Sequence, residues 1–76
     1  MESTKNIEKY IRDRLKQARL ESGLTQAETA DLLKRHQSFV SRSENGIRRV
    51  DIFDLIQFGK IYNKPIMYFL PEDLFA

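Results

Sequence analysis

The sequence predicts an all-α fold in which five short helices form one compact bundle. Apolar residues recur every three or four positions along most of the chain, which is the spacing that lines one face of a helix. Residues that favour helix starts and stops divide this pattern into five segments, and no segment is typical of a strand. A chain of 76 residues is expected to form a single domain, residues 1–76, with a small core.

The first helix is expected over about residues 6–21, and its pattern is amphipathic. Charged residues line its outer sides, and Gly23 ends it. Its apolar positions are Ile7, Tyr10, Ile11, Leu15 and Ala18.

The second helix is expected to begin after Thr25. The Thr25 side chain can accept the free amide of Glu28, whose own side chain can reach back to the Thr25 amide, and this reciprocal pair is a capping box. The apolar stripe that follows is narrow and consists of Ala27, Ala30 and Leu33.

A third helix is expected almost at once, starting at Gln37. Val40 is its buried position, and Asn45 with Gly46 favours a left-handed stop. Two helices so close in sequence can pack only at a steep angle, which leaves the outer face of the later helix free. Because an α-helix fits the major groove of DNA, we interpret about residues 25–45 as a helix-turn-helix.

The fourth helix is expected to start at Asp51, which is a good N-cap, and to stop at Asn63. Pro65 suits the first turn of a fifth helix over Ile66–Leu70, which Pro71 then breaks. The apolar positions of the fourth helix are Ile52, Leu55, Phe58 and Tyr62.

The composition argues against several classes of protein. Without cysteine the chain can form neither a disulfide framework nor a thiolate zinc site, which fits a reducing cytoplasm. The longest apolar run is too short for a bilayer, and the start, MESTKNIEKY, is too polar for a signal peptide, so we expect a cytoplasmic protein without membrane contact. His36 is the only histidine and has no acidic neighbour, so no metal site is expected. The residue arrangements that support catalysis are missing, so neither enzyme activity nor a cofactor is expected.

Positive charge is concentrated in one part of the sequence. The net charge is only +2, from 13 Lys and Arg against 11 Asp and Glu. Between residues 34 and 49, however, the cations outnumber the single acid Glu44, and they are Lys34, Arg35, Arg42, Arg48 and Arg49. One face should therefore be basic, as in proteins that bind nucleic acid.

From about Arg19 to Asp51 the chain resembles the phage repressor and Cro family of helix-turn-helix proteins, the xenobiotic-response-element type. The matching positions are Leu24, Thr25, Gln26, Ala30, Leu33, Gln37, Ser38, Val40, Ser41, Glu44, Asn45 and Gly46. The resemblance implies a lambda-repressor-like DNA-binding domain. It also implies a structural ion pair between Arg19 and Glu44 that would hold the third helix against the first.

Four residues depart from the pattern of that family. Lys34 occupies the corner where glycine is usual, and a left-handed lysine costs about 1 kcal/mol. His36 stands where serine or threonine commonly caps the third helix. Thr29 and Ser43 replace larger apolar residues, so we expect the two helices to bury less apolar area.

Four side chains of the third helix are predicted to contact bases, and they are Gln37, Ser38, Phe39 and Arg42. The amide of Gln37 can pair with adenine N6 and N7, and Arg42 suits guanine O6 and N7 or a phosphate. Phe39 could touch thymine methyl groups or instead fold back onto Leu33 or the fifth helix. The alternative for Gln37 and Ser38 is an ordinary polar helix start.

Other side chains are predicted to contact phosphates, which fixes the register of a protein on DNA without reading the sequence. Gln26, as the resemblance implies, would direct its amide and the amino terminus of the second helix at a phosphate. The remaining candidates are Lys34, His36, Ser41, Asn45, Arg48 and Arg49. For Arg48 and Arg49 the alternative is solvated surface charge.

These predictions describe a sequence-specific regulator of transcription that binds double-stranded DNA and needs no small-molecule ligand. One such unit reads few base pairs, so we expect a homodimer on a palindromic operator with half-sites about 34 Å apart. The predicted dimer contact is the apolar tail, residues 64–76, together with the fourth helix, and packing within one monomer is the alternative. A dimeric repressor is the first hypothesis, and an antitoxin-like or adaptor protein whose tail holds another protein is the second.

Overall fold

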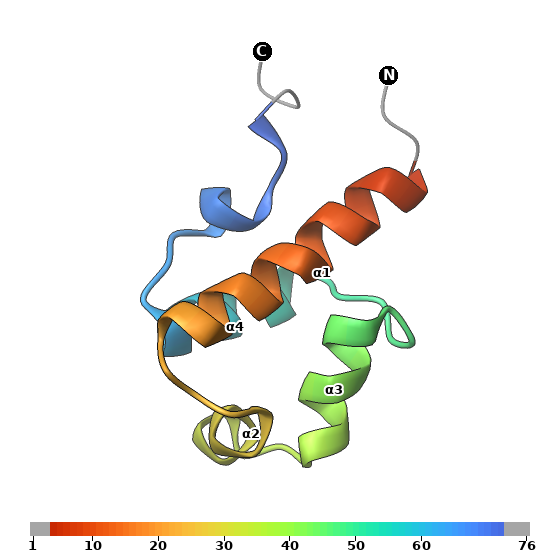
Figure 1. Cartoon of the computed structure of the whole chain (residues 1–76). Helices are drawn as coiled ribbons and strands as arrows, with labels where there is room; N and C mark the ends of the chain where they lie inside the picture. The colour runs from red at the N-terminus through yellow and green to blue at the C-terminus, as the bar shows by residue number, and fades with distance from the viewer. Residues whose placement is uncertain (1–3, 73–76) are drawn as a thin grey trace.

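The helices divide the chain much as the sequence pattern predicts. The computed structural model describes residues 4–72, with side chains from residue 6 onward (Figure 1). Residues 4–72 contain no β-strand, so the all-α prediction is confirmed. The elements are α1 (Thr4–Glu21), α2 (Gln26–Leu33), α3 (Gln37–Asn45), α4 (Ile52–Tyr62) and a 3-10 turn, η1 (Ile66–Phe69).

The fifth helix differs from the prediction in type. We expected a short helix over Ile66–Leu70, whereas η1 is a single 3-10 turn that ends at Phe69. Pro65 precedes it without a side-chain cap, and Leu70 is already extended. Prolines on both sides leave too few residues for α-helical hydrogen bonds, so the tighter turn forms instead.

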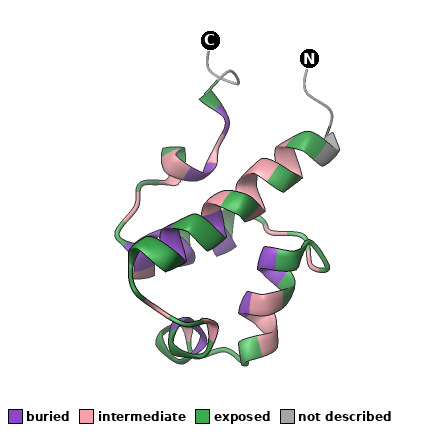
Figure 2. Ribbon diagram, in the orientation of Figure 1, coloured by how far each residue is buried: buried purple, intermediate pink, exposed green. Residues whose placement is uncertain are grey.

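The core lies between α1 and the inner faces of the other elements (Figure 2). α1 crosses the molecule and contacts α3, α4 and η1. Two predicted core positions are wrong: Ala27 and Ile52 are exposed, because each lies in the first turn of its helix on the side away from the core. The buried apolar residues are Leu15, Ala18, Ala30, Val40, Leu55, Phe58, Tyr62 and Phe69.

The two polar replacements inside the helix-turn-helix, Thr29 and Ser43, are fully buried and hydrogen-bonded. The Ser43 hydroxyl donates to the carbonyl oxygen of Phe39 at 2.7 Å. The Tyr62 hydroxyl donates to Thr29 Oγ1 at 3.4 Å and so joins α4 to α2. Because buried polar groups need such partners, these two hydroxyls are compatible with the core.

The burial of Tyr62 should make the fold sensitive to alkaline pH. Burial raises the pKa of Tyr62 to about 12, whereas a tyrosine in an unfolded chain has a pKa of about 10. Because the folded protein holds this proton more tightly than the unfolded chain, Tyr62 contributes stability that is fully present below about pH 10. This stability is lost as the pH rises through the pKa of the folded protein, and the loss amounts to about 2–3 kcal/mol.

Urea unfolding of the wild type and of Tyr62→Phe at a series of alkaline pH values measures this loss. The wild type should lose the stability, and the variant should not. The variant lacks the bond to Thr29 at every pH, so only the pH dependence of unfolding is compared. The same alkaline loss in both proteins would contradict the assignment to Tyr62.

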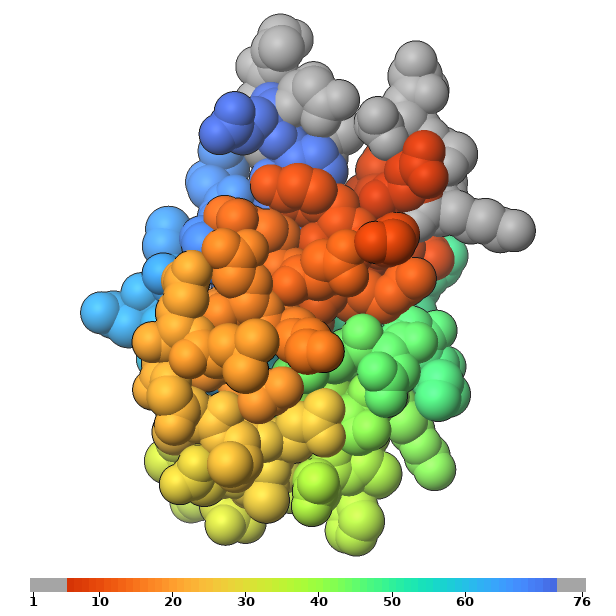
Figure 3. Space-filling view, in the orientation of Figure 1, coloured from red at the N-terminus to blue at the C-terminus, as the bar shows by residue number. Residues whose placement is uncertain are grey.

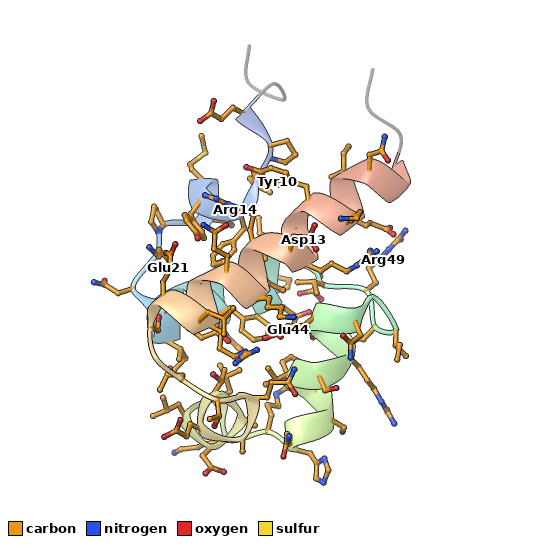
Figure 4. All side chains as sticks on the ribbon, in the orientation of Figure 1. Tyr10, Asp13, Arg14, Glu21, Glu44 and Arg49 are labelled. Atoms are coloured by element: carbon orange, nitrogen blue, oxygen red, sulfur yellow. The ribbon has the colours of Figure 1, made fainter. Side chains whose placement is uncertain are left out.

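Arg14 fixes η1 to α1 (Figure 4). Its Nε donates to the carbonyl oxygen of Tyr68 at 2.8 Å, and its guanidinium lies 3.7 Å from the centre of the Tyr68 ring. The next residue, Phe69, is completely buried. Part of the predicted dimerisation tail is therefore packed within the monomer, and residues 73–76 of that tail lie outside the described residues.

Candidate nucleic-acid interface

α2 and α3 cross steeply, as their short connection requires. In Figure 1, α2 is seen nearly end-on and α3 side-on. Lys34 forms the corner in the left-handed conformation, with a φ of 59°, which is the strained geometry expected where glycine is usual. Figure 3 shows α3 and the loop after it, in green, along the lower right margin of the molecule.

A buried ion pair fixes the inner side of α3 to α1. Arg19 Nε donates to Glu44 Oε2 at 2.7 Å, and the two side chains are 10% and 2% exposed. Arg19 Nη1 also donates to the carbonyl oxygen of Leu24 at 2.9 Å. The hydrogen bond to Glu44 holds the pKa of Arg19 above its ordinary value, although burial opposes this. The Glu44 side chain extends from α3 toward α1 and fixes one helix to the other (Figure 4).

Gln26 is turned toward this ion pair. Its Nε2 donates to Glu44 Oε1 at 3.2 Å, and the residue is half-buried. A contact from Gln26 to phosphate stays a prediction, and it would require the amide to share or leave its bond with Glu44.

His36 caps α3 in place of the usual serine or threonine. Its Nδ1 accepts the backbone N–H of Ser38 at 3.1 Å and lies 2.9 Å from Ser38 Oγ. The imidazole nitrogen thus takes the place of the hydroxyl oxygen that usually caps such a helix. His36 and Lys34 are both exposed at this end of α3, where contacts to phosphate are predicted.

The outer face of α3 groups the polar side chains that are predicted to meet DNA, away from the buried Val40. Gln37 and Arg42 are exposed, and Asn45 Nδ2 donates to Ser41 Oγ at 3.4 Å. Amide, hydroxyl and guanidinium groups supply the donors and acceptors that base edges and phosphates require. The grouped residues are Gln37, Ser38, Ser41, Arg42 and Asn45.

Phe39 is the predicted base-contacting residue that the structure places elsewhere. Its ring stacks on Phe58 of α4, with the ring centroids 5.8 Å apart and the planes 14° apart. Phe39 thus turns back toward the core, as in the second alternative, but the ring that it stacks on is Phe58 of α4 and not Leu33 or the fifth helix. Stacking against a buried ring removes apolar surface from water, which an outward-pointing ring would leave wetted.

Two arginines of the loop after α3 are paired with carboxylates. Arg48 Nη1 lies 2.7 Å from Asp54 Oδ2, and Arg49 Nη2 lies 2.7 Å from Glu8 Oε1. Burial alone would raise the pKa of Asp54, but hydrogen bonds from Arg48 and the Asp51 amide outweigh burial and hold it below its ordinary value. Arg48 is therefore fixed in its loop, and Asp54 partly neutralises its charge. Arg49 projects beside α1 in Figure 4, and its ion pair with Glu8 is exposed, so a phosphate could replace Glu8 as its partner.

Sequence reasoning missed the roles of three residues at this surface: Glu8, Arg35 and Asp54. The spacing of Asp51 and Asp54 could have revealed a capping box, in which each side chain accepts the other residue's backbone N–H. Arg35 was counted as a cation only, and its guanidinium lies 4.6 Å from the centre of the Phe39 ring. Glu8 is 41 residues from Arg49, so no local pattern could have paired them.

The described part of the chain contains neither a metal-binding group nor a membrane-spanning helix. Among side chains 6–72, no group of three His, Asp or Glu could hold a metal ion. None of the helices in the described part of the chain is long and apolar enough to span a membrane.

Comparisons with known proteins agree with this geometry. Residues 11–65, which include all of α2 and α3, match a family model described as a helix-turn-helix domain. Among solved structures, the chain is similar to an XRE-family like protein from Pseudomonas syringae pv. tomato str. DC3000. The TM-score is 0.75 and the identity 37%, and the match covers 79% of this chain and 73% of that one. A comparison with curated proteins gave no match.

Proposed function

The chain belongs to the XRE family of helix-turn-helix proteins, which are DNA-binding transcription regulators, and from this premise we propose that it is a sequence-specific repressor. It acts as a homodimer on a palindromic operator. The observation that carries the proposal is the polar outer face of α3, held in place from behind by Arg19 and Glu44. The protein works in the cytoplasm by occupying the operator and blocking polymerase, and it uses no cofactor.

The proposal divides the surface into residues that read bases and residues that bind phosphates. Gln37, Ser38 and Arg42 read base edges in the major groove. Most of the affinity comes from cations that displace counterions from DNA, so binding weakens steeply as salt rises. The phosphate contacts are assigned to Gln26, Lys34, His36, Ser41, Asn45, Arg48 and Arg49.

Selection of bound sites from a randomised pool of DNA duplexes tests the proposal. We expect one enriched motif that consists of two inverted half-sites, whose centres are about 34 Å apart. Absence of any enriched motif would contradict sequence-specific binding, and a lone half-site would contradict only the dimer. Transcription in vitro from a promoter that contains the motif should fall when protein is added, and a rise would identify an activator.

The dimer contact is assigned to the outer face of α4 together with η1. Ile52, Phe53 and Ile56 lie on this face, and Met67 lies on η1, which contacts α4. All four are large apolar side chains that remain exposed. Covering them with a second copy of the chain removes this apolar surface from water and also brings two copies of α3 to one operator.

Ile56→Glu should disrupt this dimer. A carboxylate placed in an apolar contact loses its water without gaining a partner, so the dissociation constant of the dimer should rise by at least about tenfold. Sedimentation equilibrium measures the change. Leu20→Glu is the matched control, because it places the same charge at an exposed apolar position of α1.

A wild-type protein that stays monomeric at high concentration would overturn the dimer. If a different protein co-purified in a fixed ratio and bound through the same face, the antitoxin-like or adaptor function would be favoured instead.

A further inference from the structure

Three side chains beside the outer face of α3 form one cluster that the proposed base contacts leave unexplained. The guanidinium of Arg48 lies 4.3 Å from the centre of the Phe39 ring, and that of Arg35 lies 4.6 Å from the same centre. Arg35 belongs to the turn before α3, and Arg48 belongs to the loop after it. One ring on α3 therefore holds cations from the two segments that flank the helix.

The centre of this cluster is fixed by its surroundings. Phe39 stacks on Phe58, which is completely buried, and Arg48 is tied to Asp54 by hydrogen bonds of 2.7 and 3.4 Å. Arg35 differs from Arg48, because no carboxylate within residues 6–72 lies at ion-pair distance from it. Arg35 is thus a cation that contacts the Phe39 ring and has no carboxylate partner within residues 6–72.

We propose that Phe39 is a positioning residue that holds the Arg35 guanidinium beside α3, and that Arg35 contacts a DNA phosphate. The inference rests on the proposed function, because it adds a backbone contact to the same surface. It also assigns Phe39 a role in affinity rather than in base reading.

The chemistry of a stacked guanidinium suits this role. A guanidinium that lies over a ring keeps its edge N–H groups free, and these groups form paired hydrogen bonds with phosphate oxygens. Stacking also restricts the rotamers of Arg35 before DNA binds, so Arg35 loses less conformational entropy on binding. Arg35 precedes the amino terminus of α3, where the helix dipole favours an anion.

A double-mutant cycle between Arg35 and Phe39 tests the proposal. Affinity for the selected operator and for an unrelated duplex is measured over a range of salt for the wild type, Arg35→Gln, Phe39→Leu and the double variant. Arg35→Gln should weaken both duplexes by about ten- to thirtyfold and lower the salt slope of the dimer by about 2, one phosphate contact per protomer. Phe39→Leu should weaken both duplexes by about five- to tenfold. When Phe39→Leu is already present, Arg35→Gln should have less than half of its effect in the wild type.

Two further variants separate positioning from a purely structural role. Phe39→Tyr keeps an aromatic face and should restore the affinity and the salt slope, whereas Phe39→Leu should not. Lys16→Gln removes an exposed cation from α1 and should leave the salt slope close to that of the wild type. Thermal melting of each variant shows how much protein is folded during the binding measurements.

The outcomes distinguish this inference from the function on which it rests. Additive effects of Arg35→Gln and Phe39→Leu would overturn the positioning role while leaving the repressor intact. If Phe39→Leu weakened only the operator, and only through one base pair, Phe39 would read a base and the inference would be wrong. Failure of the wild type to bind any duplex would overturn the proposed function and the Arg35 contact together.

Discussion

Replacing Glu44 with alanine is expected to unfold much of the protein at room temperature. The change leaves the Arg19 guanidinium buried without its carboxylate, and breaking a buried pair in this way costs about 3–5 kcal/mol. A domain of this size has a total stability of only about 5 kcal/mol. Circular dichroism during urea and thermal unfolding measures the loss directly.

The matched control is a carboxylate from a solvent-exposed ion pair. Lys9 Nζ lies 2.7 Å from Asp13 Oδ2, the same separation as in the buried pair, but the two side chains are 65% and 59% exposed. Asp13→Ala should therefore cost at most about 1 kcal/mol. A Glu44→Ala protein that melts like Asp13→Ala would show that the position of α3 does not depend on its buried pair.

Glu44 affects more than one element, which separates it from the residues that read DNA. Its carboxylate accepts hydrogen bonds from Arg19 on α1 and from Gln26 on α2, although it lies near the end of α3. Loss of the carboxylate would therefore disturb three helices at once. Base reading has to be tested with exposed residues on the outer face of α3, where a substitution leaves these bonds in place.

The boundaries of the helices could be predicted from sequence because they depend on neighbouring residues. Thr25 and Glu28 form the expected capping box, with bonds of 2.9 and 3.0 Å. Gly46 adopts the left-handed stop that is predicted for it, and the fourth helix ends at Asn63 as predicted, where Asn63 is also left-handed. Each of these signals is complete within a few positions, so it is visible without knowledge of the fold. The position of the fifth helix was predicted but its type was not. The flanking prolines show where a short turn must lie, but they do not show whether its hydrogen bonds are α-helical or 3-10.

The orientations of side chains at the candidate site could not be predicted in the same way. Helical periodicity places Phe39 on the flank of α3, but it cannot tell whether the ring turns toward DNA or toward Phe58 of α4. Likewise, Arg48 appears in the sequence as a loop cation, and its partner Asp54 appears only as part of the next helix start. These choices are decided by contacts between elements, which a periodic pattern does not contain.

The second large effect is expected on DNA recognition, from Gln37→Ala. A paired contact between an amide and adenine is worth about 1–3 kcal/mol, and a homodimer loses two of them, so operator binding should weaken by roughly 30- to 25,000-fold. Binding to a shuffled duplex of the same length should hardly change, because the phosphate contacts remain. Fluorescence anisotropy with both duplexes measures the two affinities.

Gln17→Ala is the matched control for this prediction, because it removes an exposed amide from α1 and leaves α3 unchanged. It should keep both affinities. Gln37 is exposed, so Gln37→Ala should also melt like the wild type, which separates a loss of reading from a loss of folding. If Gln37→Ala weakened the operator and the shuffled duplex by the same factor, Gln37 would be a backbone contact. The sequence preference would then have to come from Ser38 and Arg42.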